Sequence, residues 1–179
     1  MHPDAVAALI DAHLRTVRDY PSPGILFRDV TPVYADGPTF AAVVDAFATH
    51  QWGQVDAVLG IEARGFGIAA AMAYARGVGM VSVRKAGKLP GLLLSESYSL
   101  EYGEATLEVQ PDALPPGSRV VILDDLLATG GTLAATVRLA ERAGWIVGGL
   151  GVVIALDGLP GREALPDHEV FALSTYPAS

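Results

Sequence analysis

Residues 120–132 read VVILDDLLATGGT, in which apolar residues lead into two carboxylates and then into a turn of small residues. A run of apolar residues without alternation is typical of a strand buried on both faces, and the glycines suit a tight turn into a helix. Backbone N–H groups at that helix start, with the hydroxyls of Thr129 and Thr132, can surround a phosphate.

The two carboxylates extend this interpretation. Asp124 and Asp125 only accept hydrogen bonds when they are ionised, so they can hold vicinal sugar hydroxyls or face a hydrated magnesium ion. The segment therefore predicts a site for a phosphorylated sugar. The alternative is an ordinary strand-to-helix turn in which Thr129 caps the helix.

The rest of the chain alternates between strand-like and helix-like patterns. This alternation predicts an α/β fold with a mostly parallel, twisted sheet flanked by helices, whose ligands bind at the carboxyl ends of the strands. We expect an ordered loop rich in proline and glycine over 19–37. The predicted strands lie at 55–61, 79–83, 105–109, 119–123, within 146–156 and at 170–173. The predicted helices lie at 5–17, 39–49, 67–76, 132–143 and 161–165.

Length and composition favour a single globular domain. The chain has 179 residues, of which 51% are hydrophobic and 18% are charged, a balance that excludes a disordered protein. It has no cysteine, which excludes disulfides and thiolate chemistry. Its longest uncharged stretch, 143–156, is shorter than the roughly 20 residues of a membrane span. With Asp4 and Asp11 near the N-terminus we expect no signal peptide, no membrane partner and a cytoplasmic location.

The charge distribution points to an anionic small molecule. A net charge of −8 disfavours nucleic-acid binding, yet the only two lysines, Lys85 and Lys88, lie beside Arg84. These cations stand in a long polar segment, 84–104, that is typical of a lid or binding loop. The alternative is a solvated or mobile surface hairpin without a ligand.

A second anion-binding segment follows the strand predicted at 55–61. Arg64 offers a guanidinium fork suited to phosphate, and the glycines around it let the backbone approach a ligand. Residues 65–70 also match a dinucleotide-binding fingerprint, but Arg84 and Lys85 stand where that motif needs an acid. The histidines show no metal-ligand spacing, so we expect no zinc site.

The segment 120–132 resembles the phosphoribosyl-diphosphate signature of the type I phosphoribosyltransferases. Five further segments narrow the resemblance to the adenine phosphoribosyltransferases: PSPGILFRDVTP at 21–32, GIEARGF at 60–66, RKAGKLP at 84–90, ESYSLEYG at 96–103 and GRE at 161–163. The resemblance implies the type I fold as one domain over 1–179. Within it we expect an N-terminal hood at 1–37 and a flexible catalytic loop at 84–104.

The resemblance also implies an activity. It is transfer of the 5-phosphoribosyl group from phosphoribosyl diphosphate to adenine, giving AMP and diphosphate, with Mg²⁺ as cofactor and a homodimer as the assembly. Glu101 is the implied general acid/base and Tyr102 a loop residue. The implied residues for ribose and its 5′-phosphate are Asp124, Asp125, Ala128, Thr129, Gly130, Gly131 and Thr132. Those for diphosphate are Glu62, Ala63, Arg64, Gly65, Arg84, Lys85 and Lys88. Those for adenine are Leu26, Phe27 and Arg28.

Two positions depart from the family pattern. Ala155 stands where relatives commonly carry a glutamate, and Glu104 stands where they are often basic or polar. These departures bear on base preference rather than on the class of reaction. Two alternatives remain, a phosphoribosyltransferase for another purine base and a non-catalytic regulator that senses phosphoribosyl diphosphate. The second is disfavoured because the chain has no basic recognition helix.

Overall fold

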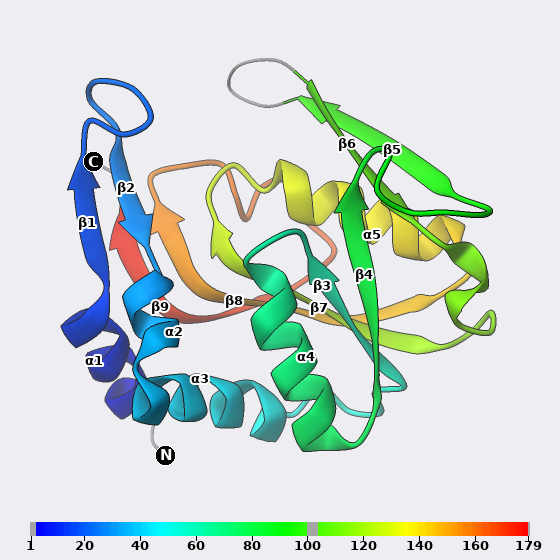
Figure 1. The fold of residues 1–179 in the computed structure, drawn as a ribbon, viewed down its shortest axis with the longest axis horizontal. Helices are drawn as coiled ribbons and strands as arrows, with labels where there is room; N and C mark the ends of the chain where they lie inside the picture. Colours follow the sequence, from blue (N-terminus) through cyan, green and yellow to red (C-terminus); the bar gives the residue numbers. More distant parts are fainter. Residues whose placement is uncertain (1–2, 100–103, 179) are drawn as a thin grey trace.

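The computed structural model describes residues 3–99 and 104–178, which form a central sheet with helices on both faces (Figure 1). Within these residues the sheet has seven strands in the order β5-β6-β4-β3-β7-β8-β9. Strand β6 runs antiparallel to both of its neighbours, and the other pairs are parallel. The strands are β3 Ala57–Ile61, β4 Gly79–Lys85, β5 Leu94–Ser99, β6 Glu104–Val109, β7 Arg119–Leu127, β8 Ile146–Asp157 and β9 Val170–Pro177.

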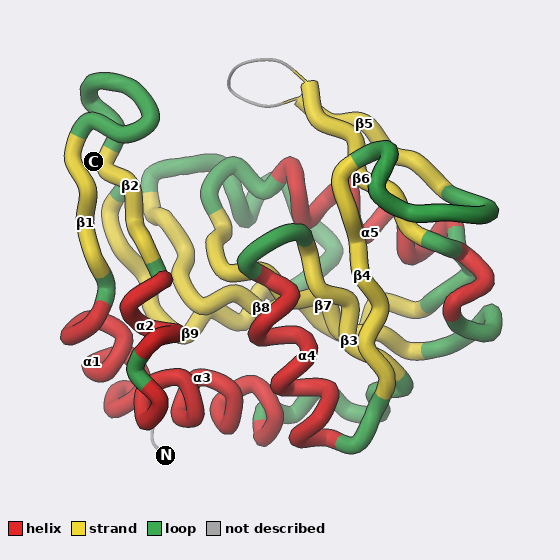
Figure 2. The backbone as a smooth tube through the Cα atoms, in the orientation of Figure 1, coloured by secondary structure: helices red, strands yellow, loops and turns green. Residues whose placement is uncertain are grey.

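Helices cover both faces of the sheet (Figure 2), so side chains of the central strands are buried in both directions. Val121 and Leu123 of β7 pack in a cluster with α1, α3 and α4, whereas Val120 and Ile122 pack with α5. Each such side chain contributes about 1.5–3 kcal/mol on burial, which explains the unbroken apolar run. The helices are α1 Pro3–His13, α2 Thr31–Ala35, α3 Gly37–Thr49, α4 Gly65–Arg76, the 3₁₀ helix Pro111–Ala113 and α5 Gly131–Arg142.

Strand β7 is longer than the sequence pattern predicts. It continues past residue 123 to Leu127 because β8 is long enough to pair with it, and Leu127 lies opposite Ala155. Asp124 and Asp125 are therefore strand residues rather than turn residues. Their backbone is held on both sides of the acidic pair by the β8 ladder.

The N-terminal segment differs most from its prediction. The helix predicted over 5–17 ends at His13, and β1 Arg15–Arg18 pairs antiparallel with β2 Leu26–Asp29. Val17, a β-branched residue that favours strands, lies opposite Phe27 in this hairpin. Strand β2 and helix α2 occupy much of the loop expected over 19–37. The hairpin and α2, which belong to the segment 1–37 expected as a hood, lie at one end of the sheet (Figure 1).

The segment 84–104 also contains more regular structure than a single loop. Strand β4 extends to Lys85, and β5 pairs with β6 from Leu94 to Ser99. Leu94, Glu96 and Tyr98 alternate along β5 and face the α5 side of the sheet, which is the pattern of a strand with one covered face. The flexibility expected of 84–104 stays a prediction. The helix predicted at 161–165 is wrong, because residues 161–164 form turns.

Candidate active site

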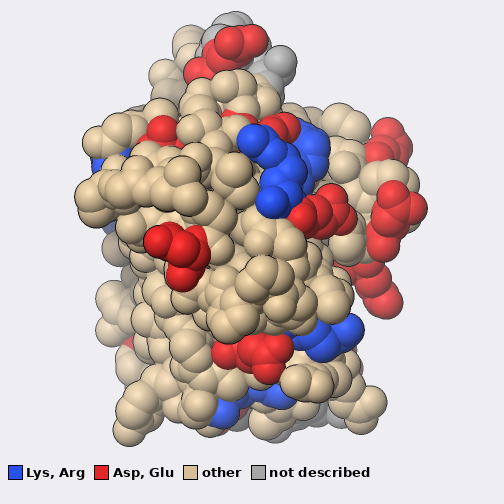
Figure 3. Space-filling view, turned by 90° about the vertical axis from the view of Figure 1, so that its right-hand side faces the viewer, with Lys and Arg blue, Asp and Glu red and all other residues tan. Residues whose placement is uncertain are grey.

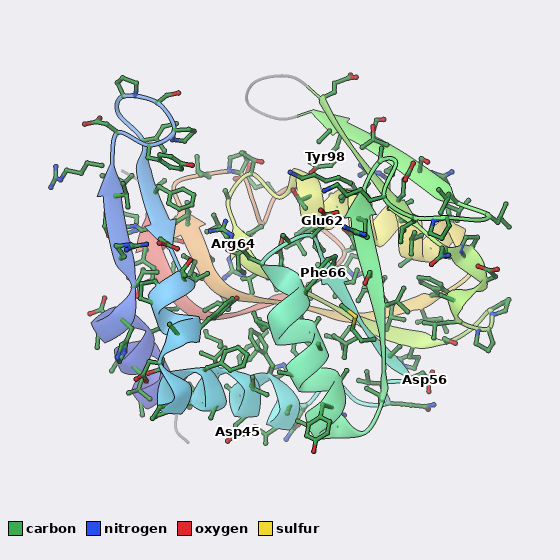
Figure 4. All side chains as sticks on the ribbon, viewed as in Figure 1. Asp45, Asp56, Glu62, Arg64, Phe66 and Tyr98 are labelled. Carbon is green, nitrogen blue, oxygen red and sulfur yellow. The ribbon has the colours of Figure 1, made fainter. Side chains whose placement is uncertain are left out.

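A cavity of about 530 Å³ opens at the carboxyl ends of β3 and β7, beside the N-terminus of α5 and the β5–β6 hairpin. This is the edge of a parallel sheet at which ligands bind. Figure 4 shows Glu62, Arg64 and Tyr98 at this edge, and Asp45 and Asp56 at the opposite one. Among the predicted site residues, the cavity walls contain Glu62, Ala63, Arg64, Lys85, Asp124, Asp125, Ala128, Thr129, Gly130 and Thr132.

Asp124 and Asp125 form a buried acidic pair in the cavity wall. The Asp125 N–H donates a 2.9 Å hydrogen bond to Oδ1 of Asp124, and Arg64 Nε lies 2.9 Å from Oδ2 of Asp125. This last contact is an ion pair without hydrogen-bond alignment, because Oδ2 has no hydrogen-bond partner within residues 3–99 and 104–178. Burial raises the pKa of both carboxyls; Asp125 raises that of Asp124 further, while Arg64 opposes the rise at Asp125. The pair suits a ligand that brings hydrogen-bond donors or a cation.

The loop after β7 depends on two glycines. Gly130 has φ +80°, and a Cβ there would lie 2.5 Å from the carbonyl oxygen of Gly161. A Cβ on Gly161 would lie 2.3 Å from the carbonyl oxygen of Ala128, so the turn that contains Gly161 packs directly on the loop. Gly130 is the N-cap of α5 and gives no side chain to the first N–H groups of the helix. The first N–H groups of a helix have no partner within the helix, so here they can bind an anion in the cavity.

Glu62 accepts hydrogen bonds from three residues at the end of β4 and just after it, Arg84, Lys85 and Lys88. Its Oε1 accepts a 2.7 Å hydrogen bond from Lys88 Nζ, and its Oε2 accepts from Arg84 Nε at 3.2 Å and from the Lys85 N–H at 3.0 Å. The peptide bond between Glu62 and Ala63 is cis. Arg84 and Lys88 therefore lie close to the cavity through Glu62, although neither lines it.

These contacts predict an acid-sensitive contribution to stability. Hydrogen bonds from Lys88, Lys85 and Arg84 lower the pKa of Glu62 from 4.5 to about 2 despite its burial. Its ionised form therefore stabilises the fold fully above pH 4.5, and that contribution is lost as the pH falls toward 2. We expect Glu62→Gln to lower the free energy of unfolding by about 1–2 kcal/mol at neutral pH, a modest value because Lys88 is half exposed.

Urea unfolding of both proteins at several pH values measures this difference. The gap between wild type and Glu62→Gln should narrow steadily below pH 4.5. A gap that is the same at neutral pH and near pH 3 would show that the carboxylate charge of Glu62 does not stabilise the fold.

Phe27 of the β1–β2 hairpin contacts Arg64, a residue of the cavity wall. Its ring centroid lies 5.3 Å from Cζ of Arg64, the residue that also pairs with Asp125, and 5.1 Å from the ring centroid of Tyr20. Arg28 points elsewhere: its Nη1 donates to Oγ1 of Thr16 at 2.7 Å, and its Cζ lies 5.3 Å from the Tyr176 ring centroid. Leu26, Phe27 and Arg28 are not among the cavity walls.

The remaining predicted residues fall into two groups. Gly65 and Gly131 do not line the cavity; a Cβ on Gly65 would lie 2.8 Å from the carbonyl oxygen of Leu123, so Gly65 allows α4 to start against β7. Glu101 and Tyr102 lie outside the described residues. The sequence reasoning missed Tyr98, which lines the cavity and contacts Thr132, because that contact exists only once β5 lies against α5.

On the face in Figure 3, the few Lys and Arg side chains lie beside Asp and Glu side chains rather than forming a broad basic surface. Glu96 likewise pairs with Arg138 at 2.5 Å and with Arg142 at 2.8 Å. This arrangement fits a small anionic ligand better than a nucleic acid.

Comparison with known proteins places the chain in a family. The model of the phosphoribosyl transferase domain matches residues 34–172. The adenine phosphoribosyltransferase of Clavibacter michiganensis is 61% identical over 167 residues, which cover 93% of this chain and 95% of that protein. The chain belongs to the adenine phosphoribosyltransferase family. Proteins with the phosphoribosyl transferase domain generally use phosphoribosyl diphosphate with magnesium.

Solved adenine phosphoribosyltransferases share the fold. The crystal structure from Thermoanaerobacter pseudethanolicus has a TM-score of 0.91 at 42% identity, covering 95% of this chain and 99% of that one. The Saccharomyces cerevisiae enzyme, solved with an imino-altritol bisphosphate and adenine, has a TM-score of 0.91 at 39% identity and the same coverage. The expected type I α/β fold is confirmed. None of the helices in the described residues is long and apolar enough to span a membrane.

Proposed function

We propose that this chain transfers the 5-phosphoribosyl group of phosphoribosyl diphosphate to N9 of adenine, releasing diphosphate and forming AMP. Members of its family carry out this reaction in purine salvage, and the family membership extends the activity to this chain. The main structural support is a single cavity that combines a buried acceptor pair, a glycine loop at a helix N-terminus and a cluster of cations.

The phosphate end of the substrate is assigned to the loop after β7. The N–H groups and hydroxyls of residues 128–132 can donate to the 5′-phosphate, which the helix dipole also attracts. Asp124 and Asp125 can accept hydrogen bonds from the 2′- and 3′-hydroxyls of ribose. This assignment covers Ala128, Thr129, Gly130, Gly131 and Thr132.

The diphosphate end is assigned to the loop after β3 and to the cations of β4. Arg84 and Lys88 form ion pairs with Glu62, and a diphosphate can take over their hydrogen bonds because both cations are partly exposed. Preorganised cations of this kind stabilise the negative charge that develops on the leaving group. The assigned residues are Glu62, Ala63, Arg64, Gly65, Arg84, Lys85 and Lys88.

The base is assigned to the hood. Phe27 offers an aromatic face near Arg64, and the backbone groups of Leu26 and Arg28 can read the edge of adenine. The Arg28 side chain takes no part, because Thr16 and Tyr176 hold it away. As the C1–N9 bond forms and the bond to diphosphate breaks, Glu101 is the residue assigned as the acid/base at the purine, and Tyr102 is assigned with it.

Asp124 and Asp125 fit a magnesium ion that is bound mainly by substrate. Buried Oδ2 of Asp125 lacks a hydrogen-bond donor, and in the part of the chain described, no three His, Cys, Asp or Glu residues cluster as a metal site. Mg²⁺ commonly takes one or two carboxylates, waters and substrate phosphates as ligands, which matches this pair. When bound, the ion would neutralise charge on the leaving diphosphate. The homodimer implied by the resemblance stays a prediction.

An assay with the purified protein tests the proposal. We expect AMP from adenine and phosphoribosyl diphosphate, no product from hypoxanthine, guanine or xanthine, and loss of activity when EDTA removes the magnesium. Restoring Mg²⁺ serves as the control for the EDTA arm. Product from a 6-oxo purine instead of adenine would overturn the base assignment, and binding of phosphoribosyl diphosphate without turnover would favour the regulator.

A further inference from the structure

Tyr98 lies on β5 and lines the cavity that also contains Asp124 and Asp125. Its ring packs against the core beside α5, and its phenol oxygen accepts a 3.1 Å hydrogen bond from Oγ1 of Thr132. Two residues earlier on the same face of β5, Glu96 pairs with Arg138 and Arg142 of α5. The position of Tyr98 is therefore set by its packing and by the ion pairs of Glu96, two residues earlier on the same face of the strand.

In the hydrogen bond between Thr132 and Tyr98, Thr132 is the donor, so the phenol proton of Tyr98 is not used. Thr132 is in the first turn of α5, and its only hydroxyl proton points to the phenol oxygen. A phenol is also a donor, and no acceptor for the Tyr98 proton exists among residues 3–99 and 104–178. The hydroxyl pair can thus supply one more hydrogen bond to a ligand in the cavity.

We propose that Tyr98 is a further positioning residue for the 5′-phosphate, acting through Thr132. When the phosphate binds, the Thr132 hydroxyl turns to donate to a phosphate oxygen, and the phenol proton of Tyr98 turns to donate to Oγ1 of Thr132. A chain of two hydrogen bonds that ends on an anion strengthens each member, because each donor polarises the next. This inference rests on the proposed function, which assigns the 5′-phosphate to the loop after β7.

Removing only the phenol hydroxyl tests the inference. We expect Tyr98→Phe, which keeps the packed ring, to raise the Kd for AMP about tenfold, as measured by isothermal titration calorimetry. The Kd for inorganic diphosphate, which carries no 5′-phosphate, should change less than about twofold. A general loosening of the hairpin would weaken both ligands alike and would overturn the inference.

Ser97→Ala is the matched control. Ser97 lies next to Tyr98 on the other face of β5, and its hydroxyl bonds Oγ1 of Thr106 at 2.8 Å, outside the cavity walls. It removes one hydroxyl from the same hairpin and should leave both dissociation constants unchanged. A loss of AMP affinity in Ser97→Ala equal to that in Tyr98→Phe would overturn the inference, because hairpin stability alone would then explain it.

Thr132→Val separates failure of the inference from failure of the proposed function. If the inference holds, adding Tyr98→Phe to Thr132→Val weakens AMP binding no further, because the phenol acts through Thr132. If Thr132→Val binds AMP more weakly and Tyr98→Phe binds it as tightly as wild type, the role of Tyr98 is overturned and the proposed function stays intact. Unchanged AMP binding in both variants overturns the phosphate assignment itself and the inference with it.

Discussion

Asp124→Asn is expected to lower kcat/KM by on the order of 100-fold and at the same time to raise thermal stability. The loss of activity follows because a hydrogen bond to a charged acceptor contributes about 1.5–3 kcal/mol, and the ribose hydroxyls would lose that acceptor. The gain in stability follows because Asp124 is buried with no ion pair among the described residues, and its burial beside Asp125 raises its pKa. Ionised Asp124 therefore opposes folding, and asparagine removes that cost.

The pH dependence of stability gives a second measure of the same variant. A group whose pKa is raised in the folded state takes up protons on folding, so its contribution becomes less favourable as the pH rises above its ordinary value of 3.8. The excess stability of Asp124→Asn over wild type should therefore grow from acid to neutral pH, as followed by thermal unfolding.

Asp45→Asn provides the control for this pair of effects. Asp45 lies on α3 at the opposite edge of the molecule (Figure 4), exposed to solvent, and the change should alter neither activity nor melting temperature appreciably. If Asp124→Asn is less stable than wild type at neutral pH, ionised Asp124 does not oppose folding, because other contacts then offset the cost of burying its charge.

Gly130→Ala is expected to abolish most activity, by 100-fold or more, and to lower the melting temperature by roughly 5–10 °C. The methyl group would lie 2.5 Å from the Gly161 carbonyl oxygen and 2.8 Å from Cβ of Ala164, at a φ of +80° that alanine rarely adopts. Backbone strain of about 1–2 kcal/mol adds to this clash, and the loop can relieve both only by moving its N–H groups away from the ligand.

Gly158→Ala separates the effect of backbone strain from the effect of a steric clash of the new methyl group. Gly158 has φ +86°, but a Cβ there meets no atom within 4 Å, so this variant carries the conformational cost alone. Differential scanning calorimetry and steady-state kinetics on both variants measure the contrast. Equal effects at the two positions would mean that the contact between Gly130 and Gly161 does not shape the phosphate loop.

The sequence predicts the core of this fold well, because its strands are buried on both sides and short loops join them to helices. Residues 120–123 show this, because their apolar run identifies a central strand without any information about the contacts that the rest of the chain makes. The hood is harder to predict. Val17 belongs to a strand only because Phe27 pairs with it across a turn, and local spacing at residues 5–17 favours the helix instead.

In the candidate site too, residues carried by one segment can be predicted, and contacts between distant segments cannot. Asp124, Asp125 and Thr132 could be predicted because one short segment carries them. Tyr98 could not, because its contact with Thr132 joins residues 34 positions apart and depends on how β5 lies against α5. The link from Arg64 to both Asp125 and Phe27 likewise arises from three separate elements.

Glu62 has a consequence for the entropy of ligand binding. Lysine and arginine side chains have many rotamers, and fixing one costs about 1–2 kcal/mol of conformational entropy. Because Glu62 already restrains Arg84 and Lys88, much of that ordering takes place when the chain folds. When an anion enters the cavity, Arg84 and Lys88 exchange the Glu62 carboxylate for the anion as their acceptor. A larger part of the interaction energy between these cations and the anion is then available as affinity.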